Sequence, residues 1–230
     1  MNDSKKLWLS VDKKFSDNNV TLGKYTSDDI INNPRQVCFV SARYKFVSKM
    51  FENLNEVIEV GCGDGYGSPF VAQNVKNLIS TDINHDLIID CNKRYKFLNN
   101  VDFQYFEFRE KPYPKKVNAI YLVDVIEHIF PEEENNFIKN ITESLTENGV
   151  LLIGTPNKTA EEYASRWSKE AHINLKNHLS LKELCHRFFY NVFLFGMNDE
   201  VLHTGFNPMC HYLWALCVDL KYSYTYEQKD

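Results

Sequence analysis

The residues with the clearest chemical potential form one glycine-rich stretch, Val57-Ile58-Glu59-Val60-Gly61-Cys62-Gly63-Asp64-Gly65-Tyr66-Gly67. Its first residues are typical of a short apolar strand, and Ser68 to Lys76 can form a helix, so the glycines occupy the turn between the two. Glycine has no Cβ, and such a turn lets backbone approach a ligand closely. The first N–H groups of the helix then favour negative charge. The stretch therefore predicts a ligand-binding loop.

The spacing of the glycines discriminates between cofactors. The dinucleotide pattern G-x-G-x-x-G would require glycine at position 66 or 68, where the chain has Tyr66 and Ser68. The pattern present is E-x-G-x-G-x-G, and with it the chain resembles the class I S-adenosylmethionine-dependent methyltransferases, whose first motif has that form. The resemblance implies that this motif binds the cofactor through Glu59, Gly61, Cys62, Gly63 and Gly65.

A second carboxylate follows about 20 residues after the loop, as expected for a ribose-binding residue. Residues 78–83 are predicted to form the next strand, with Asp82 at its C-terminal end. A carboxylate there can accept both hydroxyls of a ribose, which NAD and S-adenosylmethionine share. The alternative is that Asp82 only caps a helix starting near Asp86. We predict that Asp82 and Ile83 contact the cofactor.

The third strand is predicted over residues 101–108, where apolar and polar residues alternate. In the class I methyltransferases that the chain resembles, the end of this strand carries an acidic residue that bonds the adenine amino group. The matching residue here is Glu107, although the family more often has Asp followed by a small residue.

The fourth strand, over 117–125, is a nearly continuous apolar run, typical of a parallel strand covered on both faces. The Asp-Val-Ile-Glu-His run at 124–128 resembles the post-strand motif of ubiquinone-biosynthesis and type 11 methyltransferases. The resemblance implies that Asp124 and Val125 line the methionine side of the cofactor. Arg43 lies on a predicted amphipathic helix over 35–53 and either binds a carboxylate or substrate anion or lies on a solvated face.

Three histidines are candidate catalytic bases, because histidine titrates near neutral pH. His203 and His172 lie in loops that leave the carboxyl ends of the predicted last parallel strands, and His128 follows strand four. We rank His203 and His172 ahead of His128, and the alternative for each is a hydrogen-bonding or surface role. The candidate acceptor-binding residues in the same loops are Asn174, Asn198, Asp199, Glu200, Tyr163 and Arg166.

Strands alternating with helices predict an α/β fold with a doubly wound, mostly parallel, seven-stranded sheet. The resemblance implies a Rossmann-like strand order 3-2-1-4-5-7-6 with the last strand antiparallel. Residues 1–34 are expected to form an extension over the active site, or else a peripheral arm. A methyltransferase domain is expected over 35–220, with a lid-like insertion at 158–179 and a polar tail at 221–230.

Composition narrows the class of protein. The 230 residues carry a net charge of −5 and 43% hydrophobic residues, which predicts a globular protein without an extended nucleic-acid-binding face. No run of 18 apolar residues occurs, so we expect no membrane span and a cytoplasmic location. Six cysteines form no C-x-x-C pair and the histidines show no zinc spacing, so no metal site is expected.

The function expected from these observations is methyl transfer from S-adenosylmethionine, by in-line displacement, to oxygen of a small molecule or glycan precursor in polysaccharide biosynthesis. The acceptor class rests on a resemblance to bacterial surface-polysaccharide methyltransferases. Methylation of nitrogen in a small amine or amino sugar is the alternative within the same fold. An NAD-dependent oxidoreductase and an inactive cofactor-binding partner subunit are the alternatives from other classes. Neither the acceptor nor the oligomeric state follows from the sequence.

Overall fold

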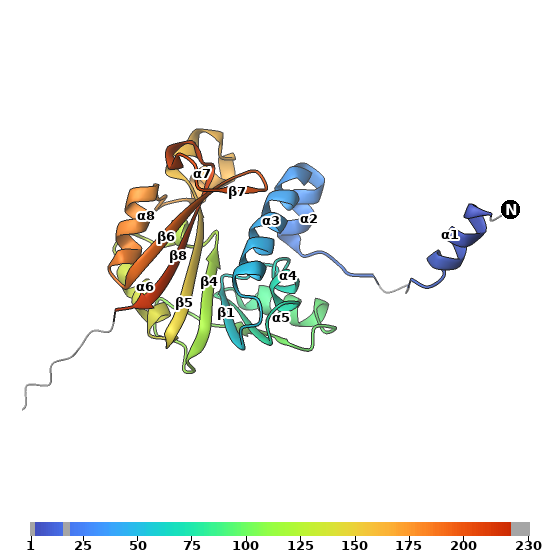
Figure 1. Ribbon diagram of the computed structural model, residues 1–230, viewed down its shortest axis with the longest axis horizontal. Coiled ribbons are helices and arrows are strands. Elements are labelled where there is room, and N and C mark those ends of the chain that lie inside the picture. The colour runs from blue at the N-terminus through green and yellow to red at the C-terminus, as the bar shows by residue number, and fades with distance from the viewer. Residues whose placement is uncertain (1–2, 16–18, 222–230) are drawn as a thin grey trace, which may run out of the picture.

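One eight-stranded sheet carries the fold, with strand order β3-β2-β1-β4-β5-β8-β6-β7 (Figure 1). The computed structural model describes residues 3–15 and 19–221. The predicted polar tail therefore lies, apart from Lys221, outside the described residues.

The first five strands run parallel to one another. They are β1 (Glu56–Val60), β2 (Asn77–Asp82), β3 (Val101–Tyr105), β4 (Val117–Val123) and β5 (Leu145–Pro156). Parallel pairing brings all five carboxyl ends to one edge of the sheet, where ligands bind in open α/β sheets. The predicted order 3-2-1-4-5 is confirmed.

The C-terminal strands complete the sheet in antiparallel fashion. β8 (Tyr212–Leu220) lies between β5 and β6 (Phe189–Asn198) and is antiparallel to both, as predicted for the last strand. The expected count of seven strands is wrong, because β7 (Val201–His203) adds a further edge strand that pairs with β6. This strand is three residues long and partly polar, so the sequence shows no period-2 pattern for it.

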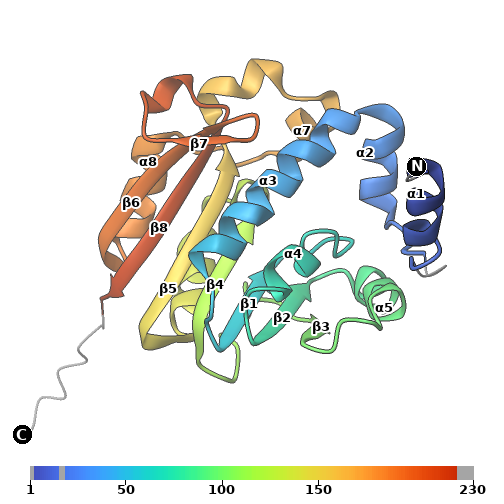
Figure 2. The same cartoon turned by 45° about the vertical axis from the view of Figure 1, so that its right-hand side comes forward.

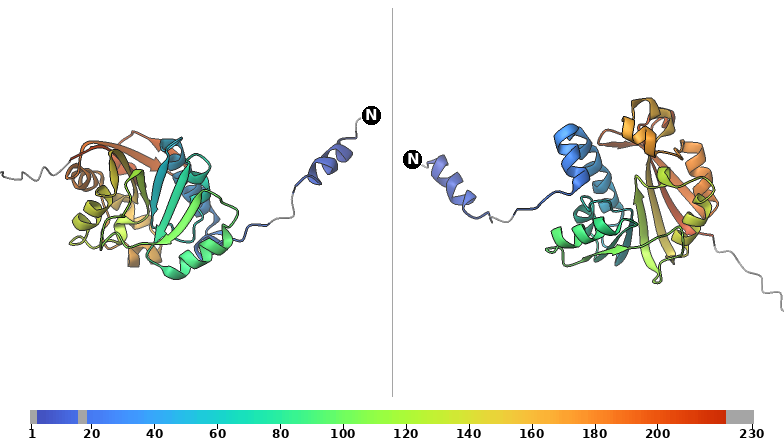
Figure 3. Two further views of the ribbon diagram at one scale, coloured as in Figure 1. Left: turned by 90° about the horizontal axis from the view of Figure 1, so that it is seen from below. Right: turned by 180° about the vertical axis from the view of Figure 1, so that it is seen from behind.

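Helices cover both faces of the sheet, which explains the apolar run of β4. Ala119 and Tyr121 face α3 (Pro34–Met50) and α4 (Ser68–Ala72), whereas Ile120 and Leu122 face the opposite layer. That layer contains α6 (Glu134–Thr142) and α8 (His178–His186), and α5 (His85–Arg94) packs beside β3. Figure 2 shows α3 crossing one face of the sheet, and Figure 3 shows it from below and behind.

Two segments stand outside this layered pattern. At the N-terminus, α1 (Ser4–Asp12) has no buried residue and lies apart from the sheet in Figure 1, whereas α2 (Lys24–Asn32) packs against α3. After β5 the chain forms η2 (Lys158–Tyr163) and α7 (Arg166–Ala171) before α8. Within the described ranges, no helix has both the length and the apolar character needed to cross a membrane.

Candidate functional site

The glycine loop between β1 and α4 forms a wall of a cavity at the carboxyl edge of the sheet. Gly61, Gly63 and Gly65 have φ of 75°, 56° and 74°, a left-handed conformation that glycine adopts without steric cost. A Cβ on Gly61 would lie 2.5 Å from a methyl of Val125, so the loop packs tightly on the β4 end. A Cβ on Gly63 would meet only the Tyr25 ring, at 3.8 Å, because this glycine faces the cavity.

Asp82 ends β2 with its carboxylate held beside the loop. Oδ2 accepts the Gly63 N–H at 2.9 Å, and Oδ1 accepts the Asn84 N–H at 2.8 Å. Each oxygen can accept a second hydrogen bond, and both Asp82 and Ile83 line the cavity. The two backbone bonds fix the orientation of the carboxylate, so it is prepared to receive paired hydroxyl donors.

Glu59 lies inside the sheet layer and does not line the cavity. Its Oε2 accepts hydrogen bonds from Ser68 at 2.6 Å, at the start of α4, and from Ser80 at 2.7 Å on β2. Burial raises the pKa of Glu59, and the two serine donors oppose that rise. Glu59 thus joins the strands that flank the glycine loop to the helix after it. Gly65 also lies outside the lining, where a Cβ would meet Tyr95 at 2.8 Å.

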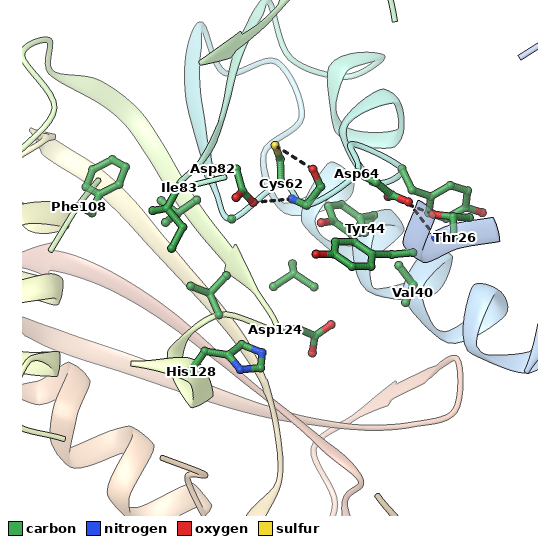
Figure 4. A pocket seen from close by; sticks show the side chains of 18 of the residues that line it. Thr26, Val40, Tyr44, Cys62, Asp64, Asp82, Ile83, Phe108, Asp124 and His128 are labelled. Carbon is green, nitrogen blue, oxygen red and sulfur yellow. Dashed lines mark hydrogen bonds between the residues drawn. The ribbon is translucent and has the colours of Figure 1, made fainter. Parts of the chain in front are cut away.

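The cavity has a volume of about 530 Å³ and lies between the strand ends and the N-terminal helices (Figure 4). This volume falls within the roughly 300–1,000 Å³ usual for small-molecule sites. From the helical side it is lined by Tyr25 and Asp29 of α2 and by Val40 and Tyr44 of α3. Part of the predicted N-terminal extension, α2, therefore contributes lining residues to the cavity.

Asp64 attaches α2 to the glycine loop. Its carboxylate accepts the Thr26 N–H at 2.8 Å and the Thr26 hydroxyl at 3.1 Å. The N-cap of α2 is Gly23, which has no side chain to cap the helix, so Asp64 caps it from 38 residues away. A Cβ on Gly23 would lie 2.4 Å from the Asp64 side chain, which explains the glycine there. Sequence reasoning did not assign Asp64, although it stands inside the motif.

Beyond β3, Glu107 and its neighbours form the far wall. The Arg109 guanidinium donates to both Glu107 oxygens at 2.8 Å and lowers the pKa of that carboxyl. The rings of Phe106 and Phe108 meet edge to face, with centroids 4.7 Å apart, and all four residues line the cavity. The arrangement offers apolar surface beside an ionised pair.

Beyond β4, Asp124 and Arg43 form a half-buried ion pair. Arg43 Nη1 lies 2.7 Å from Asp124 Oδ2, and the guanidinium stacks 4.0 Å over the Tyr212 ring. Asp124 lines the cavity together with Val125, and its Oδ1 is buried without a partner among the described residues. Arg43 is not among the lining residues. The predicted cofactor contact of Arg43 therefore remains a prediction, and the structure gives it Asp124 as a partner.

Glu127, His128 and His172 come together just past Asp124, and we call them the Glu127–His128–His172 cluster. One carboxylate oxygen and one nitrogen from each ring lie within 4.8 Å of one another. Burial, with a smaller contribution from Asp124, raises the pKa of Glu127 to about 8, and burial lowers the pKa of His172. His128 lines the cavity. The His172 ring contacts the His128 ring edge to face, with centroids 5.2 Å apart. No metal site was expected, because the sequence shows no histidines at zinc spacing, and His128 and His172 are 44 positions apart.

The other predicted acceptor residues do not line the cavity. Asn174 is buried and donates to Ile129 O and to Glu134 Oε2, both at 2.9 Å. Lys176 pairs with Glu134 and donates to Asn174 Oδ1, which closes a network within the protein. Asn174 therefore has defined structural partners, and its role toward an acceptor remains a prediction.

The remaining predicted residues lie on β6, on β7 and in the turn between them, and in the insertion after β5. His203 Nδ1 accepts the Gly205 N–H at 3.0 Å, and Asn198 bonds Met209 O and the His211 N–H. Asp199 and Glu200 form the turn between β6 and β7, where Asp199 has φ of 51°. In the insertion, Tyr163 is 77% exposed and Arg166 pairs with Glu170 on the same helix. None of these side chains faces the cavity.

Comparison with known proteins identifies methyltransferases as relatives of this chain. A family model described as a methyltransferase domain matches residues 33–193. The chain is 30% identical over 104 residues to a probable S-adenosylmethionine-dependent methyltransferase of Mycolicibacterium smegmatis, covering 45% of this chain and 38% of that protein. It is 31% identical over 114 residues to a ubiquinone biosynthesis O-methyltransferase of Rickettsia akari, covering 47% of this chain and 43% of that protein. The chain thus spans less than half the length of both relatives.

Among solved structures, the fold is similar to that of the N-methyltransferase NodS from Bradyrhizobium japonicum in complex with S-adenosyl-L-homocysteine. The TM-score is 0.60 at 14% identity, and the alignment covers 82% of this chain and 89% of NodS. At this identity the likeness concerns the fold.

Proposed function

Because a methyltransferase-domain model matches residues 33–193, the chain belongs to the class I S-adenosylmethionine-dependent methyltransferases, and from that premise we propose its reaction. We propose that it transfers the cofactor's methyl group to an oxygen of a small polar acceptor, such as a glycan precursor. The observation that carries the proposal is a set of oriented polar atoms around one cavity: the Asp82 carboxylate, the Gly63 backbone and Asp124 Oδ1.

The cavity residues fit S-adenosylmethionine. Asp82 offers two oriented oxygens to the ribose hydroxyls, and Phe106 and Phe108 offer apolar surface beside Glu107 to the adenine. Asp124 Oδ1 is a buried acceptor without a partner, which suits the positively charged amino group of the cofactor. When bound, the cofactor supplies an electrophilic methyl group on a positively charged sulfur.

The protein's own contribution is positioning and exclusion of water. α2 and α3 cover the cavity from one side, and the Asp64–Thr26 bonds keep α2 attached to the loop. Holding two reacting groups in line can lower the barrier by roughly 7–11 kcal/mol in favourable cases. We therefore expect α2 to act in binding as well as in folding.

His128 is the residue that we place beside the acceptor oxygen. Its Nδ1 donates to Ala171 O at 3.0 Å, so the proton sits on Nδ1 and Nε2 keeps its lone pair. A lone pair at the cavity wall suits a hydroxyl that must lose its proton. The O-methyltransferase relative supports oxygen as the acceptor atom. Nitrogen is the second candidate, supported by the N-methyltransferase whose fold the chain shares.

Calorimetric titration with S-adenosylhomocysteine, with NAD in parallel, tests the cofactor site. We expect Asp82→Ala to weaken binding about 10- to 100-fold, as the loss of a charged hydrogen-bond partner predicts. Asp86→Ala, which removes an exposed carboxylate four residues later, is the matched control and should bind like the unmodified protein. Equal affinity in both variants, or binding of NAD alone, would contradict the proposal.

Product analysis tests the acceptor atom. We would incubate the protein with S-adenosylmethionine and matched pairs of hydroxylated and amino sugars, and locate any added methyl group by mass spectrometry. Methylated hydroxyl products support the proposal, and methylation of the amino member alone would replace it with the nitrogen alternative.

A further inference from the structure

The Glu127–His128–His172 cluster has more free ligand atoms than a proton-transfer site needs. Glu127 Oε1 and His172 Nδ1 are both buried and have no hydrogen-bond partner among the described residues. Glu127 is wholly buried, so its unpaired oxygen carries the full cost of desolvation. Buried polar atoms in native proteins normally have partners. Two neighbouring side chains that each have a buried atom without one therefore point to a missing ligand.

In Glu127 and His128, one side-chain atom is already held by a hydrogen bond. Thr155 Oγ1 donates to Glu127 Oε2 at 3.0 Å, and His128 Nδ1 donates to Ala171 O at 3.0 Å. In metal sites, outer hydrogen bonds of this kind fix the ligand tautomer and orientation. The atoms that these bonds leave free are Glu127 Oε1 and His128 Nε2. A carboxylate oxygen and the second nitrogen of a neutral imidazole each offer a lone pair to a metal ion.

Backbone hydrogen bonds connect the segment that carries Glu127 and His128 to the segment that carries His172. The carbonyl of Glu127 accepts the N–H groups of Ile173 and Asn174, both at 3.0 Å. His172 is thereby bound to η1 (Ile126–His128) although it comes from the segment after α7. Two ligands adjacent in sequence and a third fixed by backbone hydrogen bonds make a site that exists before any ligand binds.

Charge in the region favours a cation. Glu127 has no ion pair with a described residue, and the nearby Arg43 is paired with Asp124. A buried carboxylate without a positive partner is unfavourable, and a divalent ion supplies that partner. The cluster is a polar site whose missing component is positive.

We propose that the Glu127–His128–His172 cluster binds one divalent transition-metal ion, of the Zn²⁺, Mn²⁺ or Fe²⁺ type, at the edge of the cavity. Two imidazoles and one carboxylate suit these ions, whereas Mg²⁺ and Ca²⁺ prefer oxygen ligands. Zinc–ligand bonds of about 2.0–2.2 Å would draw the three donor atoms closer than they lie now.

Three protein ligands leave coordination positions open, as in catalytic metal sites. Since His128 lines the cavity, an acceptor oxygen can occupy one of them. This part of the inference rests on the proposed function and refines it. His128 Nε2 then binds the ion instead of acting as the base, and the ion would lower the pKa of the bound acceptor hydroxyl. The hydroxyl proton would pass to solvent water, and the acceptor oxygen would bond to the methyl carbon as S-adenosylhomocysteine leaves.

Titration of untagged, chelator-treated protein with Zn²⁺ in a calorimeter tests the site, and Co²⁺ absorption reports the ligand geometry. We expect one equivalent to bind the unmodified protein. His172→Ala and Glu127→Gln should weaken binding by more than the roughly 10- to 100-fold that loss of an outer hydrogen bond costs, and Thr155→Val by about that amount. His178→Ala is the control, because His178 Nδ1 is also buried and unpartnered but belongs to no such cluster.

The outcomes separate the two proposals. Glu127→Gln keeps the side-chain shape, and its unfolding midpoint and S-adenosylhomocysteine affinity show whether the fold survives. No binding of Zn²⁺ or Co²⁺ to the unmodified protein, or equal binding by Glu127→Gln and His178→Ala, overturns the metal site. If the unmodified protein bound Zn²⁺ but not S-adenosylhomocysteine, that result would instead contradict the proposed function. If neither removal of the metal by a chelator nor its return changed the rate of methyl transfer, the ion would have no role in binding the acceptor.

Discussion

The two halves of the sheet's carboxyl edge use polar side chains in different ways. At the β1–β3 half, Asp82 and Asp64 bond to the glycine loop and to α2, and these bonds shape a cavity. At the β5–β8 half, Asn174 and Lys176 bond to Glu134, and none of the three lines that cavity. The second half is richer in polar residues in sequence, yet the first half holds the cavity.

The difference shows that polar density alone does not mark a binding site. What marks it is a polar atom that is oriented by neighbours and still free to bond. Such atoms gather where the two halves meet, at the end of β4, in Asp124 Oδ1 and Glu127 Oε1. The comparison predicts that substitutions in the first half change cofactor affinity, whereas those in the second half change stability alone.

The largest expected effect comes from Gly61→Ala. A Cβ there would lie 2.5 Å from Val125 on a backbone with φ of 75°. We expect a loss of about 2–5 kcal/mol in the free energy of unfolding, from the left-handed backbone and the clash together, and weaker S-adenosylhomocysteine binding. Gly205→Ala in the other half should stay within about 0.5 kcal/mol. Urea unfolding and calorimetry measure both, and similar losses in the two variants would contradict the comparison.

Next comes Lys176→Met, which leaves Glu134 buried without its nearest cation. We expect a loss of about 3 kcal/mol, toward the lower end of the range for a broken buried pair. Arg187 remains 3.9 Å from Glu134 and offsets part of the cost. Affinity for S-adenosylhomocysteine should not change, and Lys176→Met with Glu134→Gln should recover much of the stability. A fall in cofactor affinity would show that the network reaches the cavity.

A smaller effect is expected from Asp64→Ala, which removes both hydrogen bonds to Thr26. Loss of a helix cap costs about 1–2 kcal/mol, and here it should appear as faster amide exchange in α2 and weaker S-adenosylhomocysteine binding. Asn198→Ala is the matched variant, because the Asn198 side chain also makes two hydrogen bonds, in its case both to backbone. If Asn198→Ala weakened cofactor binding as much as Asp64→Ala, α2 would have no special role.

The smallest expected effect concerns Glu107 and its partner Arg109. The pKa of Glu107 is lowered in the folded protein by Arg109, so its contribution to stability is present above the ordinary value of 4.5 and is lost as pH falls through the lowered pKa. Glu107→Gln should therefore cost less than about 1 kcal/mol at pH 7 and nothing at low pH. Glu170→Gln, which breaks a more exposed pair with Arg166, is the matched control and should change stability less at pH 7. Urea unfolding across pH 3–7 distinguishes them.

The sequence predicted the parts of the site that depend on local backbone. Glycines at 61, 63 and 65 require a turn, and the C-terminal end of β2 places Asp82 beside it, because parallel strands end at one edge. The strand order and the antiparallel last strand were also predicted, through resemblance. β7 was missed, since a three-residue edge strand depends on backbone pairing with β6 rather than on its side-chain pattern.

Tertiary structure alone decided which distant residues meet. Asp64 caps a helix that begins 40 residues earlier in the chain, Arg43 pairs with Asp124 across 81 residues, and His172 reaches Glu127 through backbone bonds. No periodicity encodes such contacts, because they arise from how helices and loops pack onto the finished sheet. The amino-acid sequence thus specified a glycine-rich turn through local conformational preference, and only packing determined which carboxylates and histidines kept atoms without a hydrogen-bond partner.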